Sequence, residues 1–73
     1  MKDENMSVVE RFIEHFGSVS AAARAIKRDR QVVQQWRKKS IPWAWAVEIE
    51  RVTGGAIKSS EVHDEAAKVR HHG

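Results

Sequence analysis

The segment DRQVVQQWRKK at residues 29–39 limits the fold of this chain most, because its large apolar and long polar side chains separate only when it is helical. One side of that helix carries Val32, Val33 and Trp36. The opposite side carries the polar residues Gln31, Gln34, Gln35 and Lys38. Asp29 precedes this pattern as an N-cap residue does, which predicts a helix from about Arg30. Such a helix packs by one side and leaves the other side free.

The free side carries groups that recognise DNA bases. A glutamine amide offers a donor and an acceptor that match the edge of adenine, and an arginine fork matches the edge of guanine. The predicted base-reading residues are Arg30, Gln31, Gln34 and Gln35.

Positive charge is concentrated around the same helix. Residues 24–39 contain seven basic residues and one acidic residue, although the whole chain has a net charge of only +3. A basic run is often only a solvated surface, but its coincidence with the glutamine side favours contact with a phosphate backbone. The residues predicted to contact phosphates are Ser18, Ser20, Arg24, Lys27, Arg28, Lys38 and Lys39.

Composition predicts one small all-α domain. Seventy-three residues suffice for a single core, and the absence of cysteine excludes disulfides and thiolate metal sites. No stretch shows the alternation of a half-buried strand. No apolar run approaches the roughly 18 residues of a membrane span, and the N-terminus lacks the hydrophobic region of a signal peptide. We therefore expect a cytosolic protein that does not contact a membrane.

Two helices are predicted before the segment 29–39. Ser7 and Glu10 form a capping box for the first, and Gly17 ends it in a left-handed conformation. Its apolar stripe is Val9, Phe12, Ile13 and Phe16. Ser18 or Ser20 caps the second helix, which runs to about Ile26. The inward residues of that helix are Ala22, Ala23 and Ile26.

Two more helices are predicted after it, which makes five short helices in all. The fourth begins at Ser40-Ile41-Pro42, runs to about Thr53 and is stopped by Gly54-Gly55. Its core side is Trp45, Ala46, Ile49 and Val52. Ser59 or Ser60 caps the last helix, in which Val62, Ala66 and Val69 share one side. The expected domain is 7–70, between a flexible segment 1–6 and a loose tail 71–73.

An ordered series of landmarks resembles the small phage Cro repressors, especially their all-helical members, over about residues 9–67. It consists of HFG, the run GSVSAAARAIKRDRQVVQQWRKKSIP, and the later EI and VTGGAIK segments. The resemblance implies a lambda-repressor-like helix-turn-helix domain with its motif at residues 18–38. It also implies a repressor in the bacterial host cytosol, associated with the nucleoid, that occupies a palindromic operator in double-stranded DNA.

The turn of the motif departs from the family pattern of a glycine followed by an aliphatic residue. Lys27 takes the glycine position and would need a positive φ. Arg28 takes the aliphatic position, where its stem can cover the core edge while its head reaches a phosphate.

Trp43 and Val47 lie one turn apart on the side of the fourth helix that the core does not use. We expect them to form the interface of a weak homodimer that is strengthened on DNA, with residues Val62 and Val69 as the alternative location. A partly covered surface tryptophan and a DNA-backbone contact are the other interpretations of Trp43.

Other functions are less compatible with the sequence. The four histidines have no spacing that predicts a metal site, and five short helices leave little room for a catalytic pocket. No metal, no cofactor and no enzymatic activity are expected. Two alternatives to a phage repressor remain: an antitoxin-type, plasmid or chromosomal Cro-like regulator, and a protein-interaction module that does not bind DNA.

Overall fold

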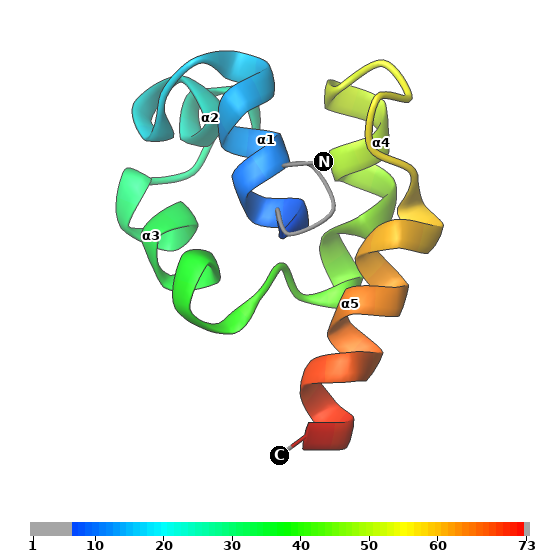
Figure 1. Ribbon diagram of the computed structural model, residues 1–73. Helices are drawn as coiled ribbons and strands as arrows, with labels where there is room; N and C mark the ends of the chain where they lie inside the picture. Colours follow the sequence, from blue (N-terminus) through cyan, green and yellow to red (C-terminus); the bar gives the residue numbers. More distant parts are fainter. Residues whose placement is uncertain (1–6, 73) are drawn as a thin grey trace.

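The computed structural model describes residues 7–72 of the chain, and the side chains of residues 7–67. These residues form helices and no strand, arranged around one core (Figure 1). The elements are α1 (Val8–Phe16), α2 (Val19–Ala25), α3 (Arg30–Lys39), the 3-10 helix η2 (Trp43–Trp45), α4 (Ala46–Val52) and α5 (Ser59–His72). The flexible segment expected at 1–6 and the end of the tail at Gly73 lie outside the described residues, whereas α5 continues through His72.

The ends of α1 are formed as predicted, with one exception. The Ser7 hydroxyl accepts from the Glu10 amide at 3.2 Å, and Gly17 ends the helix at φ 99°. The carboxylate of Glu10 does not complete a capping box, because it accepts instead from Arg37 Nε at 3.0 Å. α1 is therefore joined to α3 through this carboxylate.

The predicted caps of α2 and α3 have different outcomes. Ser18, and not Ser20, caps α2 by accepting from the Ala21 amide at 3.1 Å. Asp29 occupies the N-cap position of α3 but its side chain accepts no capping hydrogen bond, so that part of the prediction is wrong. Asp29 instead lines an open hollow beside several basic residues.

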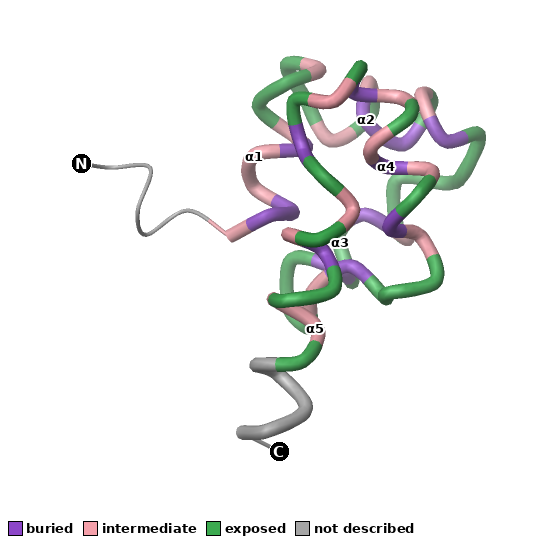
Figure 2. Tube along the Cα trace, turned by 90° about the vertical axis from the view of Figure 1, so that its right-hand side faces the viewer, coloured by how far each residue is buried: buried purple, intermediate pink, exposed green. Residues whose placement is uncertain are grey.

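Apolar side chains from all the helices meet in the core. Figure 2 marks the buried positions along the chain in purple. The largest of those that are less than 2% exposed are Phe12, Ile41, Ile49, Ile57, Val9, Val33 and Val62. Ile57 lies in the connection between α4 and α5, where it is 1% exposed and belongs to the core. Burial of these side chains is the main force that holds such short helices together.

The fourth predicted helix is divided at its start. Ile41 is buried, and Pro42 disfavours a helical conformation at the residue before it, so the chain stays extended there. A single 3-10 turn follows, in which the Trp45 amide donates to the Pro42 carbonyl at 2.9 Å. The α-helix therefore begins at Ala46 rather than at Pro42. Ser40, where α3 ends, has a φ of 123°.

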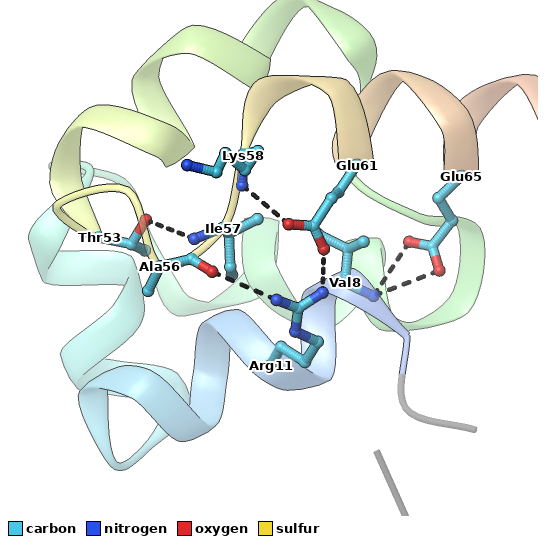
Figure 3. A network of polar contacts seen from close by, with 8 residues as sticks. All are labelled: Val8, Arg11, Thr53, Ala56, Ile57, Lys58, Glu61 and Glu65. Carbon is cyan, nitrogen blue, oxygen red and sulfur yellow. Dashed lines mark hydrogen bonds and ion pairs between the residues drawn. The ribbon is translucent and has the colours of Figure 1, made fainter. Parts of the chain in front are cut away.

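A network of polar contacts fixes the start of α5 against α1 (Figure 3). Arg11 pairs with Glu61, and the other oxygen of Glu61 accepts from the Lys58 amide at 3.1 Å. The Val8 amide donates to both carboxylate oxygens of Glu65 at 3.3 Å. Ser59 and Ser60 do not cap α5, since Ser59 is its first helical residue and donates its amide to Glu50 at 3.0 Å.

No helix in the described part of the chain combines the length and the apolar character needed to cross a membrane.

Candidate nucleic-acid interface

α2, α3 and the turn between them form a helix-turn-helix unit. α2 packs against α3, and its residues Ala22 and Ala23 are buried. Small side chains allow packed helices to approach closely. The Arg28 amide donates to the Ala23 carbonyl at 2.9 Å. Lys27 has a φ of 57°, which confirms the left-handed turn predicted for this position. The turn therefore has the left-handed backbone conformation that glycine usually provides, although lysine occupies the position.

The two sides of α3 are as different as its sequence predicts. Val33 is fully buried and Trp36 is 6% exposed, and Trp36 packs against Phe12 with ring centroids 6.4 Å apart. The opposite side carries four exposed residues that line one shallow hollow, namely Gln31, Gln34, Gln35 and Lys38. We call them the glutamine face. The face is available to a partner because the other side of the same helix is anchored in the core.

A second hollow continues from the start of α3 to α2 and the turn. It is lined by Ser20, Ala23, Arg24, Lys27, Arg28, Asp29 and Arg30. We call it the basic rim. Arg30, predicted to read bases together with the glutamines, lies in this rim and not in the hollow that the glutamines share. Ser18 lies at the N-cap of α2 with its hydroxyl already accepting a backbone hydrogen bond.

The basic residues around α3 differ in whether they are paired. Arg37 forms an ion pair with Glu10. Within residues 7–67, none of the basic residues predicted to contact DNA has a carboxylate partner. Lys38 and Lys39 lie at the carboxyl end of α3, where a further hollow also includes Glu65. Unpaired cations that surround the glutamine face produce a local positive potential, which attracts phosphates.

Arg28 lies on an aromatic ring that the sequence pattern did not associate with it. Its guanidinium carbon is 5.3 Å from the centroid of the Trp45 ring, a cation–π arrangement. Trp45 is half-buried and packs against Trp36 with centroids 5.4 Å apart. The helical pattern assigned Trp45 to the core, but a contact with a residue 17 positions earlier depends on how the turn meets η2, which the pattern does not specify.

Trp43 and Val47 are the large apolar residues that remain exposed among the described side chains, at 59% and 73%. The Trp43 ring has an intramolecular neighbour that was not predicted, the ring of His63 in α5 at 5.9 Å between centroids. Val62, the alternative location for an interface, is only 1% exposed and belongs to the core. That alternative is wrong for Val62, and the side chain of Val69 lies outside the described residues.

No group of three or more potential metal-ligating side chains comes together within the described part of the chain.

The family comparison matches residues 9–71 to the family described as DNA-binding transcriptional regulator Cro. The match covers most of the chain, including the whole of α2, the turn and α3. The chain belongs to the Cro family. The comparisons with curated proteins and with solved structures give no match.

Membership of the Cro family confirms the resemblance found in the sequence. This Cro-family chain is a DNA-binding transcriptional regulator with an all-helical helix-turn-helix fold. The glutamine face and the basic rim lie on the two helices that define the motif, and both surfaces are open to solvent.

Proposed function

We propose that the protein is a sequence-specific repressor that inserts α3 into the major groove of an operator and so excludes polymerase. One observation carries this proposal: the exposed side of a core-anchored helix presents three amides together, and unpaired cations flank them. Amides in a groove discriminate between bases, whereas cations bind any phosphate backbone. An arrangement of both kinds supports specific rather than general binding.

The proposed roles follow the positions of the side chains. Gln31, Gln34 and Gln35 read base edges from the middle of the groove. Arg30 reads a base at the amino end of α3, the part of a recognition helix that enters the groove most deeply. Phosphates are contacted by the residues around them, namely Ser18, Ser20, Arg24, Lys27, Arg28, Lys38 and Lys39.

We also propose that two copies bind together. One recognition helix contacts too little DNA to discriminate across a genome, and two-fold pairs of such domains bind half-sites about 34 Å apart. Trp43 and Val47 follow α3 directly and offer an exposed apolar patch for a contact between identical surfaces. The patch is small, so the dimer is weak in solution and gains from the high effective concentration on DNA.

Selection of preferred sites from random duplex DNA tests the specific function. The expected result is an imperfect palindrome whose half-site centres lie about one helical turn apart. A transcription assay on a promoter that contains the selected site should then show repression. Recovery of DNA with no enriched sequence would contradict the proposal even if the protein bound DNA strongly.

Replacement of Trp43 by alanine tests the dimer. Because Trp43 is 59% exposed, the variant should keep its fold and its affinity for a single half-site, while it binds the full palindrome more weakly and less cooperatively. A gel-shift titration measures both, with the half-site as the internal control. Unchanged cooperativity would place the interface elsewhere.

A further inference from the structure

We propose that Trp45 is a positioning residue for DNA binding: it holds the Arg28 guanidinium over its ring so that the N–H groups of Arg28 bind a phosphate of the DNA backbone. This inference rests on the proposed placement of α3 in the groove, and it deepens that proposal. Trp45 itself touches no DNA in this arrangement and acts only through Arg28.

The ring of Trp45 is fixed from below by a series of aromatic contacts. Phe12 lies fully buried on α1, Trp36 packs on it at 6.4 Å, and Trp45 packs on Trp36 at 5.4 Å between centroids. Arg28 completes the series at the surface, 5.3 Å from the Trp45 centroid. Because Phe12 and Trp36 pack behind the Trp45 ring, that ring is restrained, and so is the guanidinium in contact with it.

The cation–π contact leaves the donors of Arg28 available. A guanidinium that lies over an aromatic ring uses its face, and its N–H groups point outward in the plane, where they can form a bidentate pair with a phosphate. The described structure gives Arg28 no carboxylate partner. Restraint by the ring also lowers the conformational entropy that the arginine loses when it binds.

The position of Arg28 fits a phosphate better than a base. Arg28 lies in the turn and borders two hollows, the basic rim and a neighbouring hollow towards η2 and α4. It is absent from the hollow of the glutamine face. A residue that flanks the recognition helix on this side would meet the backbone that borders the groove and not the base edges.

The charges around the neighbouring hollow allow an anion to approach. Besides Arg28 the hollow is lined by Lys27 and one acidic residue, Glu48. Glu48 accepts a hydrogen bond from Arg51 Nε at 3.2 Å, and this contact holds the pKa of the carboxyl below its ordinary value. Glu48 is ion-paired with Arg51 and also interacts with the charge of Lys27, so the hollow has two cations, Lys27 and Arg28, against one carboxylate that already has a partner.

A double-mutant cycle on duplex DNA tests the inference. Arg28→Ala should weaken binding and reduce the slope of log affinity against log salt by about 1. Trp45→Leu should weaken binding about 3- to 10-fold when Arg28 is present, and hardly at all in the Arg28→Ala background. Arg24→Ala is the matched control, because it removes a cation of the basic rim that has no aromatic support. Its effect should add to that of Trp45→Leu.

Two variants separate positioning from a structural role. Trp45→Phe keeps an aromatic ring in the half-buried site, so it replaces Trp45→Leu in the cycle if the leucine variant does not melt cooperatively. Its effect on DNA affinity should be smaller than that of Trp45→Leu and should also require Arg28. Arg28→Lys keeps the charge but lacks the planar fork, so the salt slope should persist while the coupling to Trp45 falls. Equal effects of the Trp45 substitution with and without Arg28, or an unchanged salt slope in Arg28→Ala, would overturn the inference.

The cycle is measured on a duplex of random sequence as well as on the selected site. Phosphate contacts do not depend on sequence, so the coupling between Arg28 and Trp45 should appear on both duplexes. If site selection fails but the coupling is present on random DNA, the repressor proposal is wrong and the positioning role stands. If site selection succeeds but Arg28 and Trp45 show no coupling, the repressor proposal stands and the positioning role of Trp45 is wrong.

Discussion

On the side where α1 meets α5, charged groups bind one another, whereas the cations of the basic rim, together with Lys38 and Lys39, have no carboxylate partner within the described residues. Arg11 pairs with Glu61, and Glu65 accepts from the amide at the start of α1. Among the described side chains, no such pair involves the basic rim or Lys38 and Lys39 at the carboxyl end of α3. α3 contains residues of both kinds, because Arg37 pairs with Glu10 of α1 whereas Lys38 and Lys39 have no partner among the described side chains.

This difference separates charges that position helices from charges that remain available to DNA. A cluster of unpaired cations repels itself and so reduces stability, which is a disadvantage unless a polyanion binds there. The pairs on the other side join residues about 50 positions apart in sequence and thus fix α5 relative to α1. Substitutions on the paired side should therefore change stability, and substitutions on the unpaired side should change DNA binding.

The largest effect on stability is expected at Trp36, which belongs to the core that both sides of the molecule have in common. Trp36→Ala removes a side chain that is 6% exposed and packs between Phe12 and Trp45. The loss should be about 3 to 5 kcal/mol, a large part of the stability of a domain of this size. Thermal unfolding measures it. A cooperative transition near the wild-type midpoint would show that Trp36 does not anchor α3.

A smaller effect, on DNA affinity, is expected for residues on the unpaired side, and it should differ between the glutamine face and the cations. Gln34→Ala should lower affinity for the selected site by about 1 to 3 kcal/mol and relax the preference at one base pair. Lys38→Ala should weaken selected and random duplexes by the same factor. Titrations of both variants on both duplexes give the comparison. Equal losses for Gln34→Ala on the two duplexes would remove its role as a reader.

The sequence predicted the helices and their inner sides because both follow from local periodicity. Val33 and Trp36 are buried and Gln34 is exposed, as the 3.6-residue pattern requires. The positive φ of Lys27 was also predictable, since the position belongs to a turn of known shape. The prediction of an α-helix that begins at Ser40-Ile41-Pro42 was wrong, because Pro42 is extended and a 3-10 turn at Trp43–Trp45 precedes the α-helix.

Contacts between distant segments were not predictable in the same way. The Glu10 carboxylate could satisfy a local cap or a cation on another helix, and the structure shows it with Arg37. The contacts of Arg28 with Trp45 and of Trp43 with His63 depend on how the turn, η2 and α5 meet. The sequence pattern therefore predicts candidate DNA-binding residues within one segment, but it does not predict which residues of other segments contact them.

Substitution of Ser40, the residue that ends α3, should increase stability rather than reduce it. Its φ of 123° and ψ of 164° fall in a region that only glycine occupies without strain. Ser40→Gly should raise the free energy of unfolding by about 1 kcal/mol after the entropy cost of glycine is subtracted. Ser40→Ala is the matched control and should give no gain, because alanine has the same backbone restriction. Similar stabilities for the two variants would contradict the strain.

The smallest effect is expected at Glu61, on the paired side. The hydrogen bond from Arg11, followed by that from the Lys58 amide, lowers the pKa of Glu61. A carboxyl with a lower pKa in the folded state stabilises the fold above its unfolded pKa of about 4.3, and this contribution disappears as the pH falls through the folded value. Glu61→Gln should therefore cost about 0.2 to 1 kcal/mol near pH 7 and progressively less below about pH 4.

Glu14→Gln is the control for this last prediction, because Glu14 is an exposed carboxylate of α1 with no ion-pair partner in the described structure. Chemical denaturation at several pH values should show a pH-dependent difference from wild type for Glu61→Gln and a much smaller one for Glu14→Gln. Neither variant should change the salt dependence of DNA binding, since Glu61 is bound to Arg11 and borders none of the hollows beside α3. A shift in DNA affinity for Glu61→Gln as large as that for Lys38→Ala would mean that the paired side also takes part in binding DNA.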